Sequence, residues 1–484
     1  MIHSRSVLLL ILLLAFGCTA VGPNYRRVDP PVPARFGSLE QGIATLEPLD
    51  AQQMRSWWKL FRDRTLDSLI ERAVEGNLDL RIAEARVRQA RALLGVSSSN
   101  YYPEGGASGS GEKVRSTESQ SLGGSSSGRG ARDREERLYQ VGFDASWEID
   151  IFGGIRREVE AADADLSASR ETLRDTLVTL QGEVARNYID LRALQLRLDI
   201  AREDVKARRE YVELNEAKFR GGLTTELELS RARGALANSE STIPLLENFL
   251  FAAMYRLAVL LGQEPVSLVK ELTTTSELPH VPGNLPVGLP SDLLRRRPDI
   301  RRAERELAAA TARIGVSTAN LFPRFSLTGS YGFLNNHTDG LLDDSSNFWR
   351  IGPTIRWNIF NLKRILSTIE VTQAVRDGSL ARYEQSVLIA LEEVENALVA
   401  LSREKKRTEA LMEAVKSNGL AAELALVRFQ SGLESYLAVI DAQGALRLSQ
   451  DQFAQSKQNT ALGLISLYKA LGGGWQESDG ESPR

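Results

Sequence analysis

Two stretches of the chain alternate strictly between apolar and polar positions. In Tyr139–Ile151 every second side chain is apolar or small, and the residues between them are polar or glycine. Trp349–Ile359 follows the same pattern, Arg324–Phe333 follows it more weakly, and Gly105–Val114 more weakly still. A half-buried strand of a soluble sheet also alternates, but it usually ends after about five or six residues. Longer strands with aromatic side chains on one face and charges on the other are typical of transmembrane β-barrels. The pattern therefore favours four transmembrane strands over a soluble sheet.

Four strands are too few to close a barrel. An open sheet edge in lipid leaves backbone groups without hydrogen bonds, so the sequence predicts that several chains share one barrel. The segments that join the paired strands, Arg115–Arg137 and Asn335–Asn347, are polar and are expected as loops on the outer surface.

After each pair of strands, apolar residues recur every seven positions. The first series covers Leu177–Phe219 and resumes over Leu229–Leu257. The second covers Val387–Phe429 and Val439–Leu467, with a threonine at one step of each. A strict seven-residue repeat imposes a left-handed coiled coil. A helix over Arg156–Phe219 would be about 95 Å long at about 1.5 Å per residue, which no compact domain needs. An ordinary two-stranded coiled coil would also show this repeat, but it does not explain the strands.

Short glycine-containing segments interrupt the two seven-residue series. They are Phe219–Thr224 and Phe429–Glu434. Gly222 and Gly432 stand where a left-handed residue would end one helix. Thr224 or Thr225 in the first segment, and Ser435 after the second, can cap the next helix. Taken alone, each segment is a plain turn between two helices.

The N-terminal segment has the pattern of a secretion signal. The apolar run Val7–Leu14 is too short to span a bilayer, which needs about 20 residues, and it matches the hydrophobic part of a signal peptide. Ala15–Cys18 is interpreted as a lipobox whose cysteine receives lipid, although leucine is more usual at the position of Ala15. Thr19 follows, so the aspartate that retains such lipoproteins in the inner membrane is absent there. The alternative for Cys18 is a free thiol.

The body of the chain consists of two copies of one sequence repeat. With an offset of 220, Asp79–Pro103 aligns with Asp299–Pro323 without a gap and is identical at 11 of 25 positions. Further along, an offset of 210 matches Trp147 with Trp357 and Gly222 with Gly432. The expected organisation is a signal peptide (1–17), a lipidated tether (18–56), a first repeat (57–270), a Pro-rich linker (271–290), a second repeat (291–472) and a C-terminal tail (473–484).

The amino-acid composition excludes several classes of protein and several kinds of site. The net charge of −3 and the pI near 5.9 argue against a nucleic-acid-binding protein. A mean hydropathy of −0.23 argues against a polytopic helical membrane protein. With one Cys and three His, a zinc or iron–sulfur site is not expected. Gly124–Gly128 fits a nucleophile-elbow pattern, but it lies in a low-complexity loop instead of between a strand and a helix. The sequence therefore predicts no enzyme, no metal and no cofactor apart from a covalent lipid on Cys18.

Several longer motifs resemble the TolC-like outer-membrane factors, and they fit the lipoprotein (NodT-type) branch of tripartite efflux systems best. One departure is Arg64, because the family usually has proline after the aspartate. Together the motifs span nearly the whole mature chain in the order of the family. They are Cys18–Tyr25, Trp57–Ile70, Phe219–Arg233, Arg295–Pro323 and Phe429–Gln443.

The resemblance implies an α+β membrane protein that forms a homotrimer with a shared 12-strand barrel, four strands from each chain. A long periplasmic α-helical coiled-coil barrel with an equatorial domain would continue it. It also implies a lipid-anchored protein of the Gram-negative outer membrane. Its partners would be a periplasmic adaptor and an inner-membrane pump, expected to be of the resistance-nodulation-division type.

The resemblance also implies roles for individual residues. Asp441 falls where the family carries an acidic residue near the closed end of the tunnel. Threefold symmetry would make it a ring of three carboxylates that favours cations. The alternative is an aspartate on a solvated helix face. The adaptor would dock at the two helix tips, on Gly221, Gly222, Leu223, Thr224, Gly432, Leu433 and Ser435.

The resulting hypothesis is an exit duct for small molecules such as drugs, toxic organic compounds or metal ions. The alternative is the outer-membrane duct of a type I system that exports proteins or peptides, and a structural envelope lipoprotein ranks third. The amphipathic strands favour a duct over a structural protein, because a purely periplasmic spacer has no use for them. No sequence feature separates the two kinds of cargo.

Overall fold

A computed structural model describes residues 20–37, 44–45, 51–115, 135–279, 281 and 285–475. Cys18, the signal segment and Gly124–Gly128 lie outside these residues. The described chain divides into two units, which we treat separately. The first unit takes residues 20–28, 88–168 and 304–381, and the second takes residues 29–87, 169–303 and 382–475.

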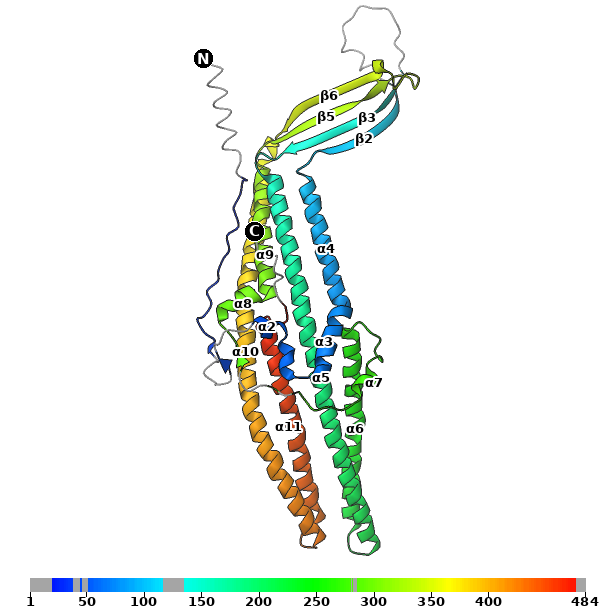
Figure 1. Ribbon diagram of the computed structural model, residues 1–484, viewed down its shortest axis with the longest axis vertical. Coiled ribbons are helices and arrows are strands. Elements are labelled where there is room, and N and C mark those ends of the chain that lie inside the picture. Colours follow the sequence, from blue (N-terminus) through cyan, green and yellow to red (C-terminus); the bar gives the residue numbers. More distant parts are fainter. Residues whose placement is uncertain are drawn as a thin grey trace, which may run out of the picture. The chain divides into compact units, whose positions relative to one another are not determined.

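The first unit contains a four-stranded antiparallel sheet (Figure 1). Its strands lie in the order β2-β3-β5-β6, so β2 and β6 form the two open edges. Gly142 of β3 faces Gly332 of β5, and a Cβ on either would lie within 3 Å of the other's Cα, so this close approach requires glycine. The strands are β2 (Glu104–Arg115), β3 (Glu135–Ile149), β5 (Arg324–Asn335) and β6 (Asn347–Arg356).

The four predicted strands are present, but two of them end earlier than the alternation suggests. β3 stops at Ile149 because Asp150 turns toward the helix that follows, where its carboxylate accepts hydrogen bonds from the backbone N–H groups of Ile155 (3.1 Å) and Arg156 (2.9 Å). β6 stops at Arg356, and a short 3-10 turn, η5 (Ile359–Asn361), follows it. Apolar alternation thus continued into residues that begin a helix.

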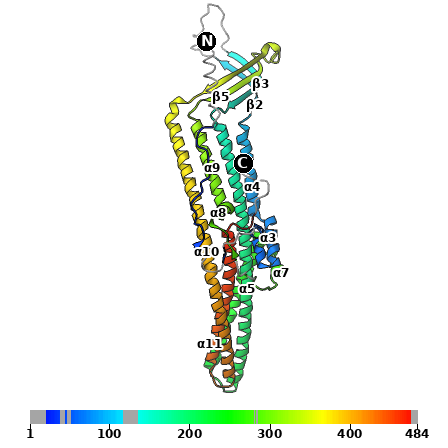
Figure 2. The same ribbon diagram turned by 60° about the vertical axis from the view of Figure 1, so that its left-hand side comes forward.

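Four long helices follow the seven-residue series. They are α5 (Gly154–Arg220), α6 (Glu226–Leu260), α10 (Leu362–Gln430) and α11 (Tyr436–Ala470). In the second unit α5 and α6 lie side by side, as do α10 and α11 (Figures 1 and 2). The series positions from Val184 to Val212 on α5 are buried, as predicted for a coiled-coil seam. Among the described residues, α6 is the one helix whose length and composition would allow a membrane crossing, and one third of its most apolar window is buried.

The remaining helices and strands complete the two units. They are α2 (Ala51–Arg55), η2 (Trp57–Phe61), α3 (Arg64–Gly76), α4 (Leu78–Ser99), α7 (Val269–Leu272), α8 (Pro290–Arg296), α9 (Pro298–Ala319), η4 (Asp344–Ser346) and the parallel pair β1 (Ala44–Thr45) and β4 (Leu285–Pro286). Arg64 is the first residue of α3, a position that favours proline but whose N–H needs no helical partner, so arginine fits there.

An aromatic cluster forms part of the core of the second unit. The buried Trp57 ring stacks on Tyr468 at 6.0 Å between centroids. Asp63 caps α3 through the N–H groups of Thr65 and Leu66, and its second oxygen accepts a hydrogen bond from the Tyr188 hydroxyl at 2.6 Å. Burial, together with this bond, raises the pKa of Tyr188 to about 12, so the phenol stays neutral and keeps donating to Asp63.

The C-terminal segment is packed as far as Trp475. Its indole N–H donates to the Arg296 carbonyl at 3.0 Å, and the guanidinium groups of Arg174 and Arg301 lie 4.7 and 5.1 Å from its ring centroid. Residues 473–475, which were expected as the start of a C-terminal tail, are therefore packed against the second unit.

Candidate functional site

Two glycine turns form one end of the second unit. We call Phe219–Thr225, between α5 and α6, the first tip, and Phe429–Ser435, between α10 and α11, the second tip. All seven residues predicted for docking lie in these two tips, and Leu223 and Leu433 are 79% and 69% exposed. Each tip therefore carries one highly exposed leucine side chain.

The tips share one backbone conformation. Gly222 and Gly432 are left-handed, with φ of 70° and 73°, as predicted. The N–H of Leu223 donates to the Lys218 carbonyl at 2.8 Å, and the N–H of Leu433 donates to the Arg428 carbonyl at 2.9 Å. This bond, which spans six residues, is the signature of a Schellman helix end. A Cβ on either glycine would meet nothing within 4 Å, so the left-handed φ, and not lack of space, demands glycine.

The caps of the following helices differ. Thr225 caps α6 through a reciprocal pair with Glu228, in which each side chain accepts from the other's backbone N–H at 3.4 Å. Thr224, the other candidate cap, instead gives its hydroxyl to the Glu228 carboxylate. Ser435 occupies the N-cap position of α11, as expected, but its side chain makes no capping hydrogen bond.

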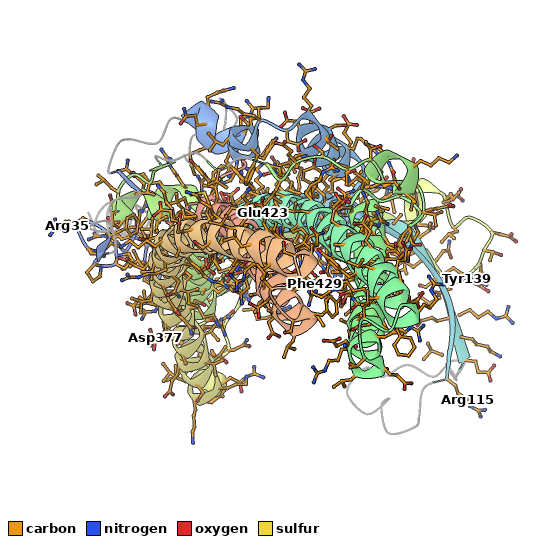
Figure 3. The ribbon with its side chains drawn as sticks, turned by 90° about the horizontal axis from the view of Figure 1, so that it is seen from below. Arg35, Arg115, Tyr139, Asp377, Glu423 and Phe429 are labelled. Carbon is orange, nitrogen blue, oxygen red and sulfur yellow. The ribbon has the colours of Figure 1, made fainter. Side chains whose placement is uncertain are left out.

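A buried aromatic cluster supports the second tip. Phe429 and Tyr436, whose rings are 5.5 Å apart, pack with Val439 against Val212 of α5 and Ala232 of α6. Phe429 is labelled on the α10 tip in Figure 3, which views this end of the molecule from below. The Lys218 ammonium lies 3.8 Å from the Phe429 ring, and Tyr211 lies 6.2 Å from Tyr436. The second tip is therefore held by side chains of α5 and α6.

Above the tips, a polar network joins three helices. The Asp204 carboxylate accepts from Arg208 at 2.9 Å and from the Ser239 hydroxyl at 2.5 Å, and Arg447 of α11 lies 4.0 Å away. Asp204 and Arg208 are both almost wholly buried. The Asp–Arg spacing of four residues was a signal for this pair, but nothing in the sequence pointed to Ser239 or Arg447.

Asp441 lies on the exposed side of α11, five residues after Tyr436. The structure records no hydrogen bond or ion pair for its carboxylate within the part of the chain that it describes. It therefore shows where the residue lies, while the gate role stays a prediction.

The sheet has one apolar face and one polar face. The register aligns Phe143, Tyr331 and Trp349 in one row, and all three rings are exposed. Pleating puts the neighbouring row, Asp144–Ser330–Arg350, on the opposite face. On that polar side Arg324 lies 3.8 Å from Glu148. An exposed aromatic face on a sheet is what a lipid-facing barrel wall needs.

At the strand–helix junction of the first unit, a polar hollow of about 790 Å³ is lined by both signs of charge. Glu104, Glu148 and Glu158 line it together with Arg324 and Arg356. No group of three or more His, Cys, Asp or Glu side chains within the described ranges could hold a metal ion. The hollow thus offers charge without a metal-binding geometry.

The segment that follows Cys18 is clamped in the first unit by the buried Arg157. Its Nε donates to the Val21 carbonyl at 3.1 Å, and its Nη2 reaches Asn24 Oδ1 at 2.5 Å. Gly22 crosses Gly315 of α9 so closely that a Cβ would lie 2.5 Å from the Gly315 Cα. The first described residues are therefore fixed to α5 and α9, a contact that no sequence pattern indicated.

Comparison with known proteins links this geometry to efflux. The family model described as "Outer membrane efflux protein" matches residues 69–263 and 289–473. Nodulation protein T of Rhizobium leguminosarum bv. trifolii is 31% identical over 468 residues, covering 96% of each chain. The toluene efflux pump outer membrane protein TtgI of Pseudomonas putida is 32% identical over 483 residues, covering 98% of this chain and 99% of the relative. The solved structure of the outer-membrane channel OprN matches with a TM-score of 0.86 at 35% identity, over 94% of this chain and 100% of that one.

Proposed function

The chain belongs to the outer membrane efflux protein family, and from this premise we propose that three copies build one duct for small molecules. The family consists of transport channels and not of enzymes. The protein is accordingly an outer-membrane exit duct that works with a periplasmic adaptor and an inner-membrane pump. The resemblance makes a pump of the resistance-nodulation-division type the expected partner.

The observation that carries the shared duct is the sheet with two open edges. Its exposed apolar face suits lipid, yet the backbone groups of β2 and β6 have no partner strand within the described chain. In lipid each unpaired group costs several kcal/mol, so β6 of one copy pairs with β2 of the next until the barrel closes. Three copies with four strands each give the 12 strands that the family resemblance implies.

The tips are the proposed docking site for the adaptor. Leu223 and Leu433 are exposed apolar side chains on the two turns, and burying them in a partner's groove would remove apolar surface from water. The paired helices α5–α6 and α10–α11 present these turns at the same end of the second unit (Figures 1 and 2). The adaptor would contact Gly221, Gly222, Leu223 and Thr224 on the first tip and Gly432, Leu433 and Ser435 on the second.

Asp441 is the proposed gate residue. Its carboxylate is exposed on α11, and threefold symmetry would place three of them around one narrow pore. Such a ring favours cations and opposes further closure through mutual repulsion. Opening would then move the second tip, because α11 carries both Asp441 and Tyr436.

A lipid on Cys18 is the proposed outer-membrane anchor. The Arg157 clamp begins at Ala20, two residues after the cysteine, so the lipid would be held close to the junction of strands and helices. Each buried methylene contributes about 0.8 kcal/mol, so several acyl chains hold firmly.

The proposed cargo is a small molecule such as a drug, a toxic organic compound or a metal ion. The relative TtgI is named for toluene efflux, and the cation efflux system protein CusC of Escherichia coli, 30% identical over 96% of this chain, is named for cations. No feature of the described chain favours protein export, the alternative that the sequence left open.

Single-channel conductance in planar bilayers tests the proposal. The purified protein should give a small, cation-selective conductance, and Asp441→Asn should increase it severalfold and reduce the selectivity. Glu423→Gln, which removes an exposed carboxylate from α10, is the matched control and should change neither (Figure 3). If Asp441→Asn behaves like the control, the duct stands and the gate assignment fails. Absence of conductance from folded, inserted protein would overturn the duct.

A further inference from the structure

The same hydrogen bond holds the turn that leads into each repeat's first strand. The indole N–H of Trp147 donates to the Tyr101 carbonyl at 3.0 Å, and that of Trp357 donates to the Leu321 carbonyl at 3.1 Å. The two tryptophans are 210 positions apart, and the two carbonyls are 220 apart, which are the offsets of the repeat. The residues that follow these carbonyls are therefore held in equivalent places.

Those following residues are both aromatic. Tyr102 lies two positions before β2, and Phe322 lies two positions before β5. Phe322 is stacked on Phe152, with ring centroids 4.5 Å apart and planes inclined by 18°. Tyr102 has no such partner in the described chain and is 72% exposed.

The second repeat carries a phenylalanine, Phe360, in the same place relative to its helix as Phe152, although it stands 208 and not 210 positions further along the chain. Phe152 lies between β3 and α5, two residues before the helix begins, and Phe360 lies between β6 and α10, also two residues before its helix. Phe360 is fully exposed. Within one chain, Phe152 of the first repeat therefore stacks on Phe322 of the second repeat. Phe360 and Tyr102 are left without a stacking partner in the described chain.

We propose that Phe360 of one copy stacks on Tyr102 of the neighbouring copy. This inference rests on the proposed function, because it requires copies that share one barrel. The sheet order puts Tyr102 beside the β2 edge and Phe360 beside the β6 edge. Closure sets β6 against the neighbour's β2 as β3 is set against β5 within the chain. The Phe360–Tyr102 pair then repeats the Phe152–Phe322 pair across the interface.

The helices next to these rings also differ in whether equivalent positions are covered within the chain. The space beside Gly315 of α9 is filled within the chain, because a Cβ there would lie 2.6 Å from the Arg157 Cγ on α5. Its repeat counterpart, Gly95 of α4, faces open space, with nothing within 4 Å of a Cβ. On α10, Leu362 and Leu366 are exposed in the first turn after Phe360. The position that is covered within the chain on α9 is therefore uncovered on α4, and in the proposed assembly a second copy covers it.

Lipid is the other surface that an exposed phenylalanine beside a barrel strand could meet. The ring in the same place in the first repeat is covered by an aromatic ring, however, and an equivalent ring, Tyr102, is uncovered on the opposite edge. A second copy explains why Tyr102 is also uncovered, and lipid around Phe360 does not.

Thiol crosslinking tests the pairing. The full-length protein is prepared as Tyr102→Cys/Phe360→Cys and treated with dibromobimane, a short crosslinker that fluoresces after reacting with two thiols. The expected product is a fluorescent ladder of covalent dimers and larger species on a denaturing gel. The matched control Phe152→Cys/Phe322→Cys should fluoresce only at the mass of one chain. The single variants control for the natural Cys18, the one cysteine of the chain.

A photocrosslinker keeps the test decisive where the cysteine pair disturbs assembly. Phe360 is replaced by p-benzoylphenylalanine, which retains an aromatic ring, and the products are mapped by mass spectrometry. A crosslink to a peptide of another copy that contains Tyr102 supports the pairing. A phospholipid adduct, or a crosslink to any other peptide, overturns it.

Native mass spectrometry, which gives the oligomeric state, and single-channel conductance distinguish a failure of this pairing from a failure of the proposed function. Protein that remains a conducting oligomer but gives no crosslink between residues 102 and 360 overturns the pairing and leaves the duct standing. Wild-type protein that is monomeric and does not conduct overturns both.

Discussion

The first tip and the second tip have the same backbone and different means of support. Their glycines have nearly the same φ, and the same backbone bonds close both turns. At the first tip Phe219 is 42% exposed and α6 is capped by its own residues, Thr225 and Glu228. At the second tip Phe429 is 7% exposed, and α11 begins without a side-chain cap. The first tip is stabilised locally, and the second by contacts with α5 and α6.

This difference bears on how the duct would open. A local cap travels with its own helix, so the first tip keeps its stability wherever the helix pair lies. The second tip loses Lys218, Tyr211 and Val212 from its aromatic cluster if α10 and α11 move away from α5. If the tip can also leave that neighbouring helix, it would have a packed and a released arrangement, and a gate needs two such arrangements.

The largest expected effect comes from removing the aromatic anchor of the second tip. Tyr436→Ala deletes a side chain that is 2% exposed, and large-to-small changes of this kind cost about 3–5 kcal/mol. Hydrogen exchange of the amides in residues 429–440 should accelerate strongly, while residues 219–230 keep their protection.

The matched control is Glu226→Ala, which changes the exposed residue 210 positions earlier on α6 and should stay within about 0.5 kcal/mol. Equal acceleration at both tips in Tyr436→Ala would mean that the tips unfold as one unit, and the proposed difference would be wrong.

A medium effect, equal at both tips, is expected from the glycines. Gly222→Ala and Gly432→Ala each force a Cβ into a left-handed conformation, at about 1–2 kcal/mol, although both sites have room for the methyl group. Exchange of the Leu223 and Leu433 amides should rise by a similar factor in the two variants. A much larger effect at Gly432 would show that the aromatic cluster also depends on the turn geometry.

These tips also show how far the sequence could be interpreted. Gly222 and Gly432 were predictable because each interrupts a seven-residue series, and backbone demands of that kind leave a mark at one position. The strands and long helices were predictable for the same reason, since their periods of 2 and 7 run through many residues.

What the sequence could not supply was the identity of partners. Phe219 and Phe429 are the same residue at equivalent positions, yet one is exposed and the other buried, because Tyr436 replaces Glu226 on the next helix. The Arg157 clamp and the Ser239–Asp204 bond join residues 35 or more positions apart, and no local pattern records such pairs.

The smallest expected effect distinguishes the two caps. Thr225→Ala removes the hydroxyl that accepts from the Glu228 N–H, which typically costs about 1 kcal/mol of helix stability. Ser435→Ala removes a hydroxyl that makes no such bond, so it should cost a few tenths of a kcal/mol at most. Exchange of the first-turn amides of α6 should therefore rise about fivefold in Thr225→Ala, and those of α11 should hardly change in Ser435→Ala. Thr225→Ser, which keeps the accepting oxygen, is the control and should restore most of the protection. If Ser435→Ala proves as costly as Thr225→Ala, the second tip is capped after all, and the contrast between local and tertiary support disappears.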